Sequence, residues 1–144
     1  MTIPRTDIRK AVVAAVTGLS TTGSAVVESR VYERKRTPEL AVFTPTDRRN
    51  DEEVTMDNDA RVVTIIVEIR AKANSALEDA LDTICGEVVA ALMADTTLNG
   101  TCDDLEFDVF DSELSGQAEK PFGLGTLEFS AFYRTLHGAP NTKL

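Results

Sequence analysis

Residues 61–73 alternate between apolar and polar side chains over a long stretch, and a helix-forming segment follows them directly. Val63, Ile65, Val67 and Ile69 fall on one side of a strand with this period, whereas the other side becomes polar toward the end. β-Branched residues dominate the stretch, and they suit the pleated surface of a sheet. We therefore expect a strand with one face on a core and the other facing water at its far end.

The helix that follows is predicted over residues 75–93. Ser75 and Glu78 have the spacing of a capping box, in which each side chain satisfies a backbone donor at the start of the helix. Behind this cap, apolar residues recur at helical spacing, and they are Leu77, Ala80, Leu81, Ile84, Cys85, Val88, Val89 and Leu92. This stripe is wide enough to cover a sheet, so strand and helix predict the two halves of one core. Glu87 lies off the stripe, and we expect an ordinary surface position there.

Another helix and four more strands complete the expected fold. The helix is predicted over residues 6–19, where apolar residues again recur at helical spacing. The strands are predicted over residues 25–32, 40–44, 105–110 and 127–134. The order α-β-β-β-α-β-β predicts an α+β fold with a mostly antiparallel sheet and two helices packed on one face. A chain of 144 residues is most simply one domain, over residues 1–144.

Three segments are expected to lie outside the regular elements. Residues 46–59 follow Pro45, are too polar to bury and are too long for a tight turn. We predict a mobile hairpin arm there, which becomes ordered against a partner. Residues 114–125 hold three glycines and a proline and predict a loop. Residues 138–144 are predicted to form a flexible tail.

The charge of the chain is acidic and unevenly distributed. A net charge of −9 argues against a nucleic-acid-binding protein, whose affinity would depend on neutralising phosphates. Residues 1–50 hold nine Lys/Arg and five Asp/Glu, a net of +4, and residues 51–144 hold six and nineteen, a net of −13. Two interpretations stay open: two differently solvated faces, or a subunit whose basic side meets the acidic side of the next copy.

The location expected from the sequence is the cytoplasm. No apolar run is long enough to cross a bilayer, and residues 1–10 lack the apolar segment of a secretory signal. Cys85 and Cys102 are expected to behave as small hydrophobic residues in a reducing compartment.

Several short motifs resemble ligand sites but fail at required positions. The segment from Gly18 to Ser24 lacks the lysine of a phosphate loop and follows a helix instead of a strand. The acidic run at residues 57–59 lacks the glycine and the closing glutamate of a calcium loop. The two cysteines have no His or Cys pair to complete a zinc site. We therefore expect no cofactor and no metal.

Catalytic residues are not specified by any pattern in the chain. His137 is the single histidine, and it could act as a base only if a nucleophile and an orienting carboxylate converged on it. Glu106 and Asp108 share a strand face, which we expect to be the solvated one. We therefore predict no enzymatic activity, with a small cytoplasmic hydrolase using His137 as the alternative from another functional class.

The order of elements resembles a known family. The residues that carry the resemblance are a helix starting at residues 8–12, strands at 26–32 and 38–44, the long strand ending Val67-Glu68-Ile69, the helix segment 77–82, and the closing strand with Leu127-Glu128-Phe129 and Tyr133. This pattern resembles the tail terminator proteins of long-tailed bacteriophages, the lambda U-like minor tail proteins. The resemblance implies a structural virion protein that forms a six-membered ring, caps the tail tube, stops its polymerisation and offers a docking surface to the head connector. A head-tail connector or neck completion protein is the closest alternative.

The resemblance also implies partners and a location. The partners would be further copies of the chain in a homo-hexameric ring, the tail tube protein and the head-tail connector protein, with no specific nucleic acid and no membrane. The protein would be assembled in the cytoplasm of the host bacterium and reside in the virion tail. The family supplies no residue motif for the interface, so we predict interface residues from charge and expected mobility alone: Arg34, Lys35, Arg36, Arg48, Arg49, Asp51, Glu52, Glu53, Asp57 and Asp59.

Overall fold

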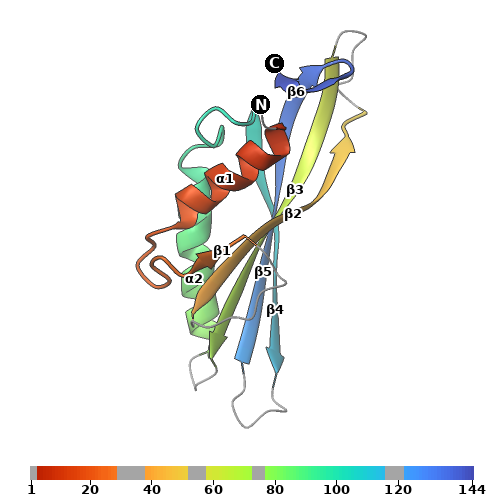
Figure 1. Ribbon diagram of the computed structural model, residues 1–144. Coiled ribbons are helices and arrows are strands. Elements are labelled where there is room, and N and C mark those ends of the chain that lie inside the picture. Colours follow the sequence, from red (N-terminus) through yellow and green to blue (C-terminus); the bar gives the residue numbers. More distant parts are fainter. Residues whose placement is uncertain (1–2, 29–37, 52–57, 73–76, 116–121) are drawn as a thin grey trace.

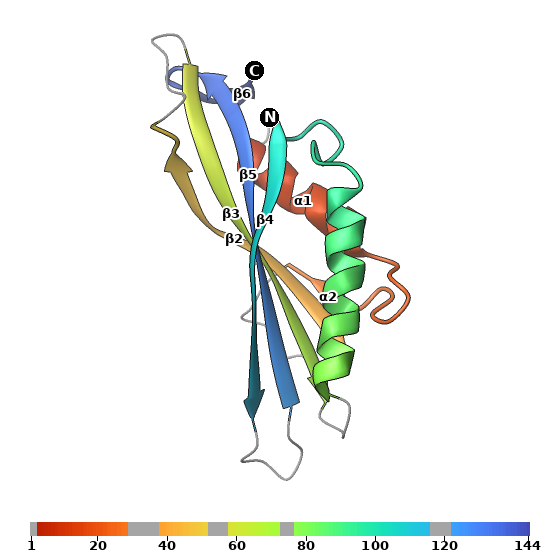
Figure 2. The ribbon, with the colours of Figure 1, turned by 180° about the vertical axis from the view of Figure 1, so that it is seen from behind.

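The computed structural model of the chain describes residues 3–28, 38–51, 58–72, 77–115 and 122–144. Its elements, in chain order, are α1 (Pro4–Val16), β1 (Val26–Val27), β2 (Glu39–Arg49), β3 (Asn58–Lys72), α2 (Leu77–Met93), β4 (Asp104–Ser115), β5 (Phe122–Leu136) and β6 (Ala139–Lys143). Two helices lie on one face of a long, twisted sheet, and no described helix lies on the other face (Figures 1 and 2). The predicted α+β class and the mostly antiparallel sheet are confirmed.

The sheet has β2 and β4 on opposite sides of a central pair of strands. Its order is β1-β2-β3-β5-β4, and β6 pairs with β5. All neighbours are antiparallel except β1, which pairs in parallel with Leu40 and Ala41 of β2. β3 and β5 pair along their whole lengths, so they form the centre of the sheet.

The core lies between the helices and one face of the sheet, as the sequence predicts. On β3, the alternate residues from Val63 to Ala71 are buried. On α2, Leu81 and Ile84 are each 1% exposed, which confirms the face assigned to that helix. From α1, one apolar residue per turn completes the core, namely Ile8, Val12 and Val16. Each of these elements alone would leave an apolar stripe in water, so burial holds the two layers together.

Glu87 lies off the buried stripe of α2, as predicted, but it has a specific partner that the sequence did not indicate. Its carboxylate accepts hydrogen bonds from the backbone N–H of Thr21 at 2.9 Å and from the Thr21 hydroxyl at 2.5 Å. Thr21 belongs to the loop after α1, so Glu87 ties that loop to α2.

The predicted hairpin arm is shorter than the sequence suggests. β2 continues through Pro45 to Arg49, and β3 begins at Asn58. The pairing register of β2 shifts between Phe43 and Thr46, and a bulge of this kind accommodates a proline that cannot donate to the ladder. Of the predicted arm, residues 46–49 and 58–59 are therefore strand, and residues 52–57 lie outside the described residues.

The predicted flexible tail is also wrong. Residues 139–143 form β6, which pairs with the end of β5 after a turn at Gly138, whose φ is +73°. Lys143 adds an ion pair with Asp103 at 3.8 Å. A five-residue strand carries no apolar pattern of its own, so its position is explained by pairing with the free backbone groups of β5 and by this ion pair.

Other boundaries differ in smaller ways. In the first predicted strand only Val26–Val27 is strand, and its continuation after residue 28 lies outside the described residues, as does the Ser75 cap. β4 and β5 are longer than predicted and leave only residues 116–121 of the predicted loop between them. A register shift in β4 lies between Phe107 and Val109, and both residues are 38% exposed.

Candidate interaction surface at the two edges of the sheet

The predicted interface residues that the structure describes gather at one end of the β2–β3 hairpin. Arg48 and Arg49 end β2, Asp51 follows in the turn, and Asp59 lies near the start of β3. Arg48, Arg49 and Asp51 are exposed. The other predicted interface residues lie outside the described residues, and they are Arg34, Lys35, Arg36, Glu52, Glu53 and Asp57.

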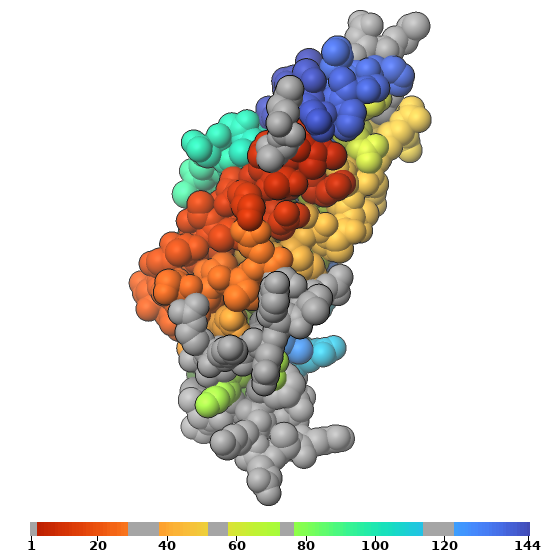
Figure 3. Space-filling model, in the orientation of Figure 1, coloured from red at the N-terminus to blue at the C-terminus, as the bar shows by residue number. Residues whose placement is uncertain are grey.

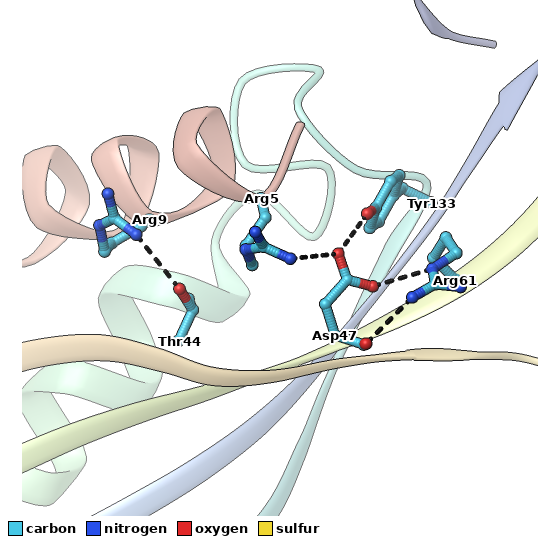
Figure 4. A network of polar contacts seen from close by, with 6 residues as sticks. All are labelled: Arg5, Arg9, Thr44, Asp47, Arg61 and Tyr133. Carbon is cyan, nitrogen blue, oxygen red and sulfur yellow. Dashed lines mark hydrogen bonds and ion pairs between the residues drawn. The ribbon is translucent and has the colours of Figure 1, made fainter. Parts of the chain in front are cut away.

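The outer side of β2 forms a basic edge of the sheet. β1 pairs only with Leu40 and Ala41, and no other described element pairs with the outer side of β2 beyond them. α1 lies along this strand, as the space-filling view shows (Figure 3). Arg5 and Arg9 project from α1 toward β2 (Figure 4). Arg48 and Arg49 add two further cations at the end of β2, and three of these four arginines have a carboxylate partner: Arg5 pairs with Asp47, Arg9 with Glu28 at 3.7 Å, and Arg49 with Asp51.

A buried carboxylate holds this edge in place. The Asp47 side chain is only 4% exposed, and it lies among Arg5, Arg61 and Tyr133 (Figure 4). Arg5 Nη1 donates to Asp47 Oδ2 at 3.2 Å, and Tyr133 Oη donates to the same oxygen at 2.6 Å. Burial raises the pKa of the Tyr133 phenol, and its hydrogen bond to Asp47 raises that pKa further. The network joins α1, β2, β3 and β5 around one charge.

The sequence offered no signal for this network. Asp47 lies in the segment that we predicted to be a mobile arm, and its partners come from three distant positions in the chain. A nearby contact strengthens the same junction: Arg9 Nη1 donates to Thr44 Oγ1 at 3.4 Å (Figure 4).

The outer side of β4 forms an acidic edge at the opposite side of the sheet. Five exposed carboxylates belong to this strand, namely Asp104, Glu106, Asp108, Asp111 and Glu113. Exposure of Glu106 and Asp108 confirms their predicted solvated position. Asp108 accepts a hydrogen bond from Ser130 Oγ at 2.5 Å. Within the described part of the chain, nothing pairs with the outer side of β4.

A concavity lies beside the start of this acidic edge. Its volume is about 590 Å³, and its lining includes Asn50, Asp103, Asp104, Glu106, Phe132 and Arg134. Asp103 is already paired with Arg134 at 3.3 Å and with Lys143 at 3.8 Å. Arg61 and Tyr133 complete this lining, so the half-buried Phe132 ring shares the concavity with two arginines and three carboxylates of the chain itself.

His137 does have a carboxylate partner. Its Nδ1 lies 2.9 Å from Asp59 Oδ1, and its side chain is 71% exposed. This hydrogen bond from His137 is the main cause that lowers the pKa of Asp59 below its ordinary value of 3.8. No other hydrogen bond of the His137 ring is present among the described residues.

The two cysteines are separate and weakly acidic. Burial raises the pKa of the Cys102 thiol to about 12, and burial followed by the charge of Asp82 raises that of Cys85. In the described part of the chain, no group of three or more His, Cys, Asp or Glu residues is placed to hold a metal ion. Neither described helix has the length and apolar character needed to span a membrane.

Among the described residues, the charged edges of the sheet are therefore the candidate interaction surfaces. Searches of protein-family models and of curated proteins find no match to this sequence.

Proposed function

We propose that the chain is a structural virion protein that acts through assembly: a ring of its copies caps a phage tail tube, stops tube polymerisation and receives the head connector. The observation that carries the assembly part is the position of the charges. The basic edge at β2 and the acidic edge at β4 lie on opposite sides of one sheet. Two different, complementary surfaces on one subunit generate a heterologous contact, and repetition of such a contact around an axis closes a ring.

The uneven charge of the sequence supports the same arrangement. The basic first third and the acidic remainder could have mixed on one surface after folding, but the sheet order separates Arg48 and Arg49 from the β4 carboxylates. Two copies of the same edge carry like charges and repel each other. The basic edge of one copy and the acidic edge of the next carry opposite charges and attract each other. The tail-capping part of the proposal comes from the resemblance of the order of elements to tail terminator proteins.

The assembly part is tested by measuring the mass of the purified chain with light scattering and imaging it by negative stain. We expect closed rings of a fixed subunit number, six by the resemblance. If charge dominates the contact, raising the salt concentration to about 1 M should weaken the ring, because the screening length then falls to about 3 Å. A chain of monomer mass at every concentration and salt would contradict assembly in solution.

The tail-capping part needs a genetic test in the viral genome that carries this gene. Inactivation of the gene should give tails of uncontrolled length that do not join heads, and the purified protein should correct extracts that contain naked tails. A connector or neck protein would instead act on filled heads. Tails of normal length joined to heads in the absence of the protein would refute the proposal.

A further inference from the structure

A polar cavity lies where the first turn of α1 meets the end of the sheet and β6. α1 begins beside β6 (Figure 1). The cavity has a volume of about 240 Å³, and its lining includes Arg5, Asp47, Asp59, Arg61, Thr135 and Pro140. A water molecule occupies about 30 Å³ in the liquid, so a group of several non-hydrogen atoms fits this space.

Thr135 is a buried residue of this wall whose hydroxyl has no partner. The residue is 4% exposed. Thr135 and Tyr133 are two positions apart on β5, so both side chains lie on the face of the sheet that carries α1. Within the described part of the chain, no group forms a hydrogen bond with the Thr135 hydroxyl. Buried hydroxyls normally have a partner, and this one therefore indicates a polar group that the cavity receives.

Arg5 and Arg61 bring more hydrogen-bond donors to the cavity than Asp47 uses (Figure 4). Arg5 gives Asp47 one bond, from Nη1, and Arg61 gives it two, from Nε and Nη2. A guanidinium group has five N–H donors, so donors remain on both arginines. The two cations also exceed the single charge of Asp47.

The start of α1 adds positive potential at the same place. Ile3 is the N-cap residue, and no side chain caps this end of the 13-residue helix. The backbone N–H groups of a helix N-terminus and the helix dipole both favour an anion there.

Asp59 is the second carboxylate of the wall, and it has partners outside the arginine pair. Its Oδ1 lies 2.9 Å from His137 Nδ1, and the backbone N–H of Gly138 donates to the same side chain. These bonds stabilise the charge of Asp59. That charge repels an anion in the cavity, so its removal tests the sign of the ligand.

We infer that this cavity binds one carboxylate group, held by the free donors of Arg5 and Arg61 and by the Thr135 hydroxyl. A planar carboxylate with a single charge matches the fork of guanidinium N–H groups. A divalent anion such as phosphate is repelled more strongly by the two aspartates of the wall. The group belongs either to a free small acid or to an acidic side chain of a second copy. This inference goes beyond the proposed ring and does not depend on it.

Binding is tested by an NMR titration with sodium acetate at constant ionic strength. We expect saturable shifts of the side-chain Nε–H signals of Arg5 and Arg61 and of the Thr135 amide. About 100 mM acetate nearly saturates a site with a dissociation constant of about 1 mM. No saturable shift up to that concentration would overturn the inference. Larger shifts with sodium phosphate or with methylammonium chloride would overturn the assignment of a carboxylate.

The role of the hydroxyl is tested with Thr135→Val, which keeps the shape of the side chain. It should raise the dissociation constant for acetate about tenfold, because a hydrogen bond to a charged group is lost. Thr64→Val is the matched control on the opposite face of the sheet and should bind acetate like the wild type. An unchanged constant in Thr135→Val would remove the hydroxyl from the site.

The charges are tested by two further substitutions, with circular dichroism to verify folding. Arg5→Met should abolish saturable acetate binding, whereas Arg9→Met removes a charge one turn further along α1, outside the lining, and should not. Asp59→Asn should strengthen acetate binding and keeps an oxygen for His137. Weaker binding in Asp59→Asn would overturn an anion site.

The two sources of the carboxylate are separated by light scattering in acetate and in chloride at equal ionic strength. A carboxylate of a second copy is displaced by acetate, so the mass of the assembly should fall and Thr135→Val should weaken assembly. A mass that is the same in both salts assigns the cavity to a free acid. A chain that is monomeric throughout would contradict the proposed ring, while the acetate titration would still decide this inference.

Discussion

Arg61 binds Asp47 twice across the β2–β3 pair. Arg61 Nε donates to Asp47 Oδ1 at 3.0 Å, and Arg61 Nη2 donates to the backbone carbonyl oxygen of Asp47 at 3.0 Å. Asp47 is thereby fixed both by its side chain and by its backbone, next to the residue that begins the exposed basic end of β2. A carboxylate with 4% exposure needs such partners, because an unpaired buried charge is strongly unfavourable.

Replacing Asp47 by asparagine should destabilise the fold. The change leaves Arg5 and Arg61 without their anion and is expected to cost about 1–3 kcal/mol, since both guanidinium groups keep contact with water. Urea denaturation measures the loss. Asp51→Asn is the control, because Asp51 is 83% exposed and pairs with a largely exposed Arg49, so its loss should cost less than about 0.5 kcal/mol. Equal stability of the two variants would show that the network contributes nothing.

Glu87→Ala should loosen the loop after α1. The change removes both hydrogen bonds to Thr21 and should lower the free energy of unfolding by about 1 kcal/mol. Hydrogen exchange should accelerate at the Thr21 amide. Glu78→Ala, at an exposed position on the same helix, should leave that exchange unchanged, whereas Leu81→Ala should cost about 2–5 kcal/mol through cavity formation in the core. If the rate of hydrogen exchange at the Thr21 amide is unchanged in Glu87→Ala, Glu87 does not hold the loop after α1.

Alanine should have opposite effects at two glycines. A Cβ atom at Gly123 would lie 2.9 Å from Leu77 Cδ2, so Gly123→Ala should overpack the core and cost about 1–3 kcal/mol. Nothing lies within 4 Å of a Cβ atom at Gly86, and this residue is inside α2. Gly86→Ala should therefore stabilise the protein by about 1 kcal/mol through helix propensity. Thermal unfolding compares the two, and destabilisation by both would contradict the open space at Gly86.

Removing the His137 ring should raise the pKa of Asp59. The His137 hydrogen bond holds that pKa below 3.8, so His137→Ala should shift the Asp59 titration toward 3.8 in an NMR pH series. A lowered carboxyl pKa stabilises the folded state above the ordinary value, and this contribution disappears as pH falls through the folded value. Asp95 is the internal control: hydrogen bonds from the Thr97 side chain and from backbone N–H groups lower its pKa, so its titration should not move. If the pKa values of Asp59 and Asp95 shift together, the substitution has changed the structure globally instead of removing one hydrogen bond.

The periodicity of the sequence was sufficient to predict the core. Val63 to Ala71 on β3 and Leu81 and Ile84 on α2 are buried as predicted, because apolar residues at period 2 or 3.6 can leave water only on one face. The α+β class followed from the order of these periodic segments. The overall charge difference between the two parts of the chain was also visible in the composition.

The position of each edge residue was decided by the tertiary structure. Pro45 seemed to end a strand, but a bulge accommodates it, and the free edge of β5 makes a strand of residues 139–143. Asp47 seemed to belong to a solvated loop, but α1, β3 and β5 bring two arginines and a tyrosine to it. The alignment of Arg48 with Asp104 depends on the register of three successive strand pairs. Local sequence patterns specify which face of an element is apolar. Partners distant in the chain determine which charges are buried and which residues of different strands are aligned across the sheet.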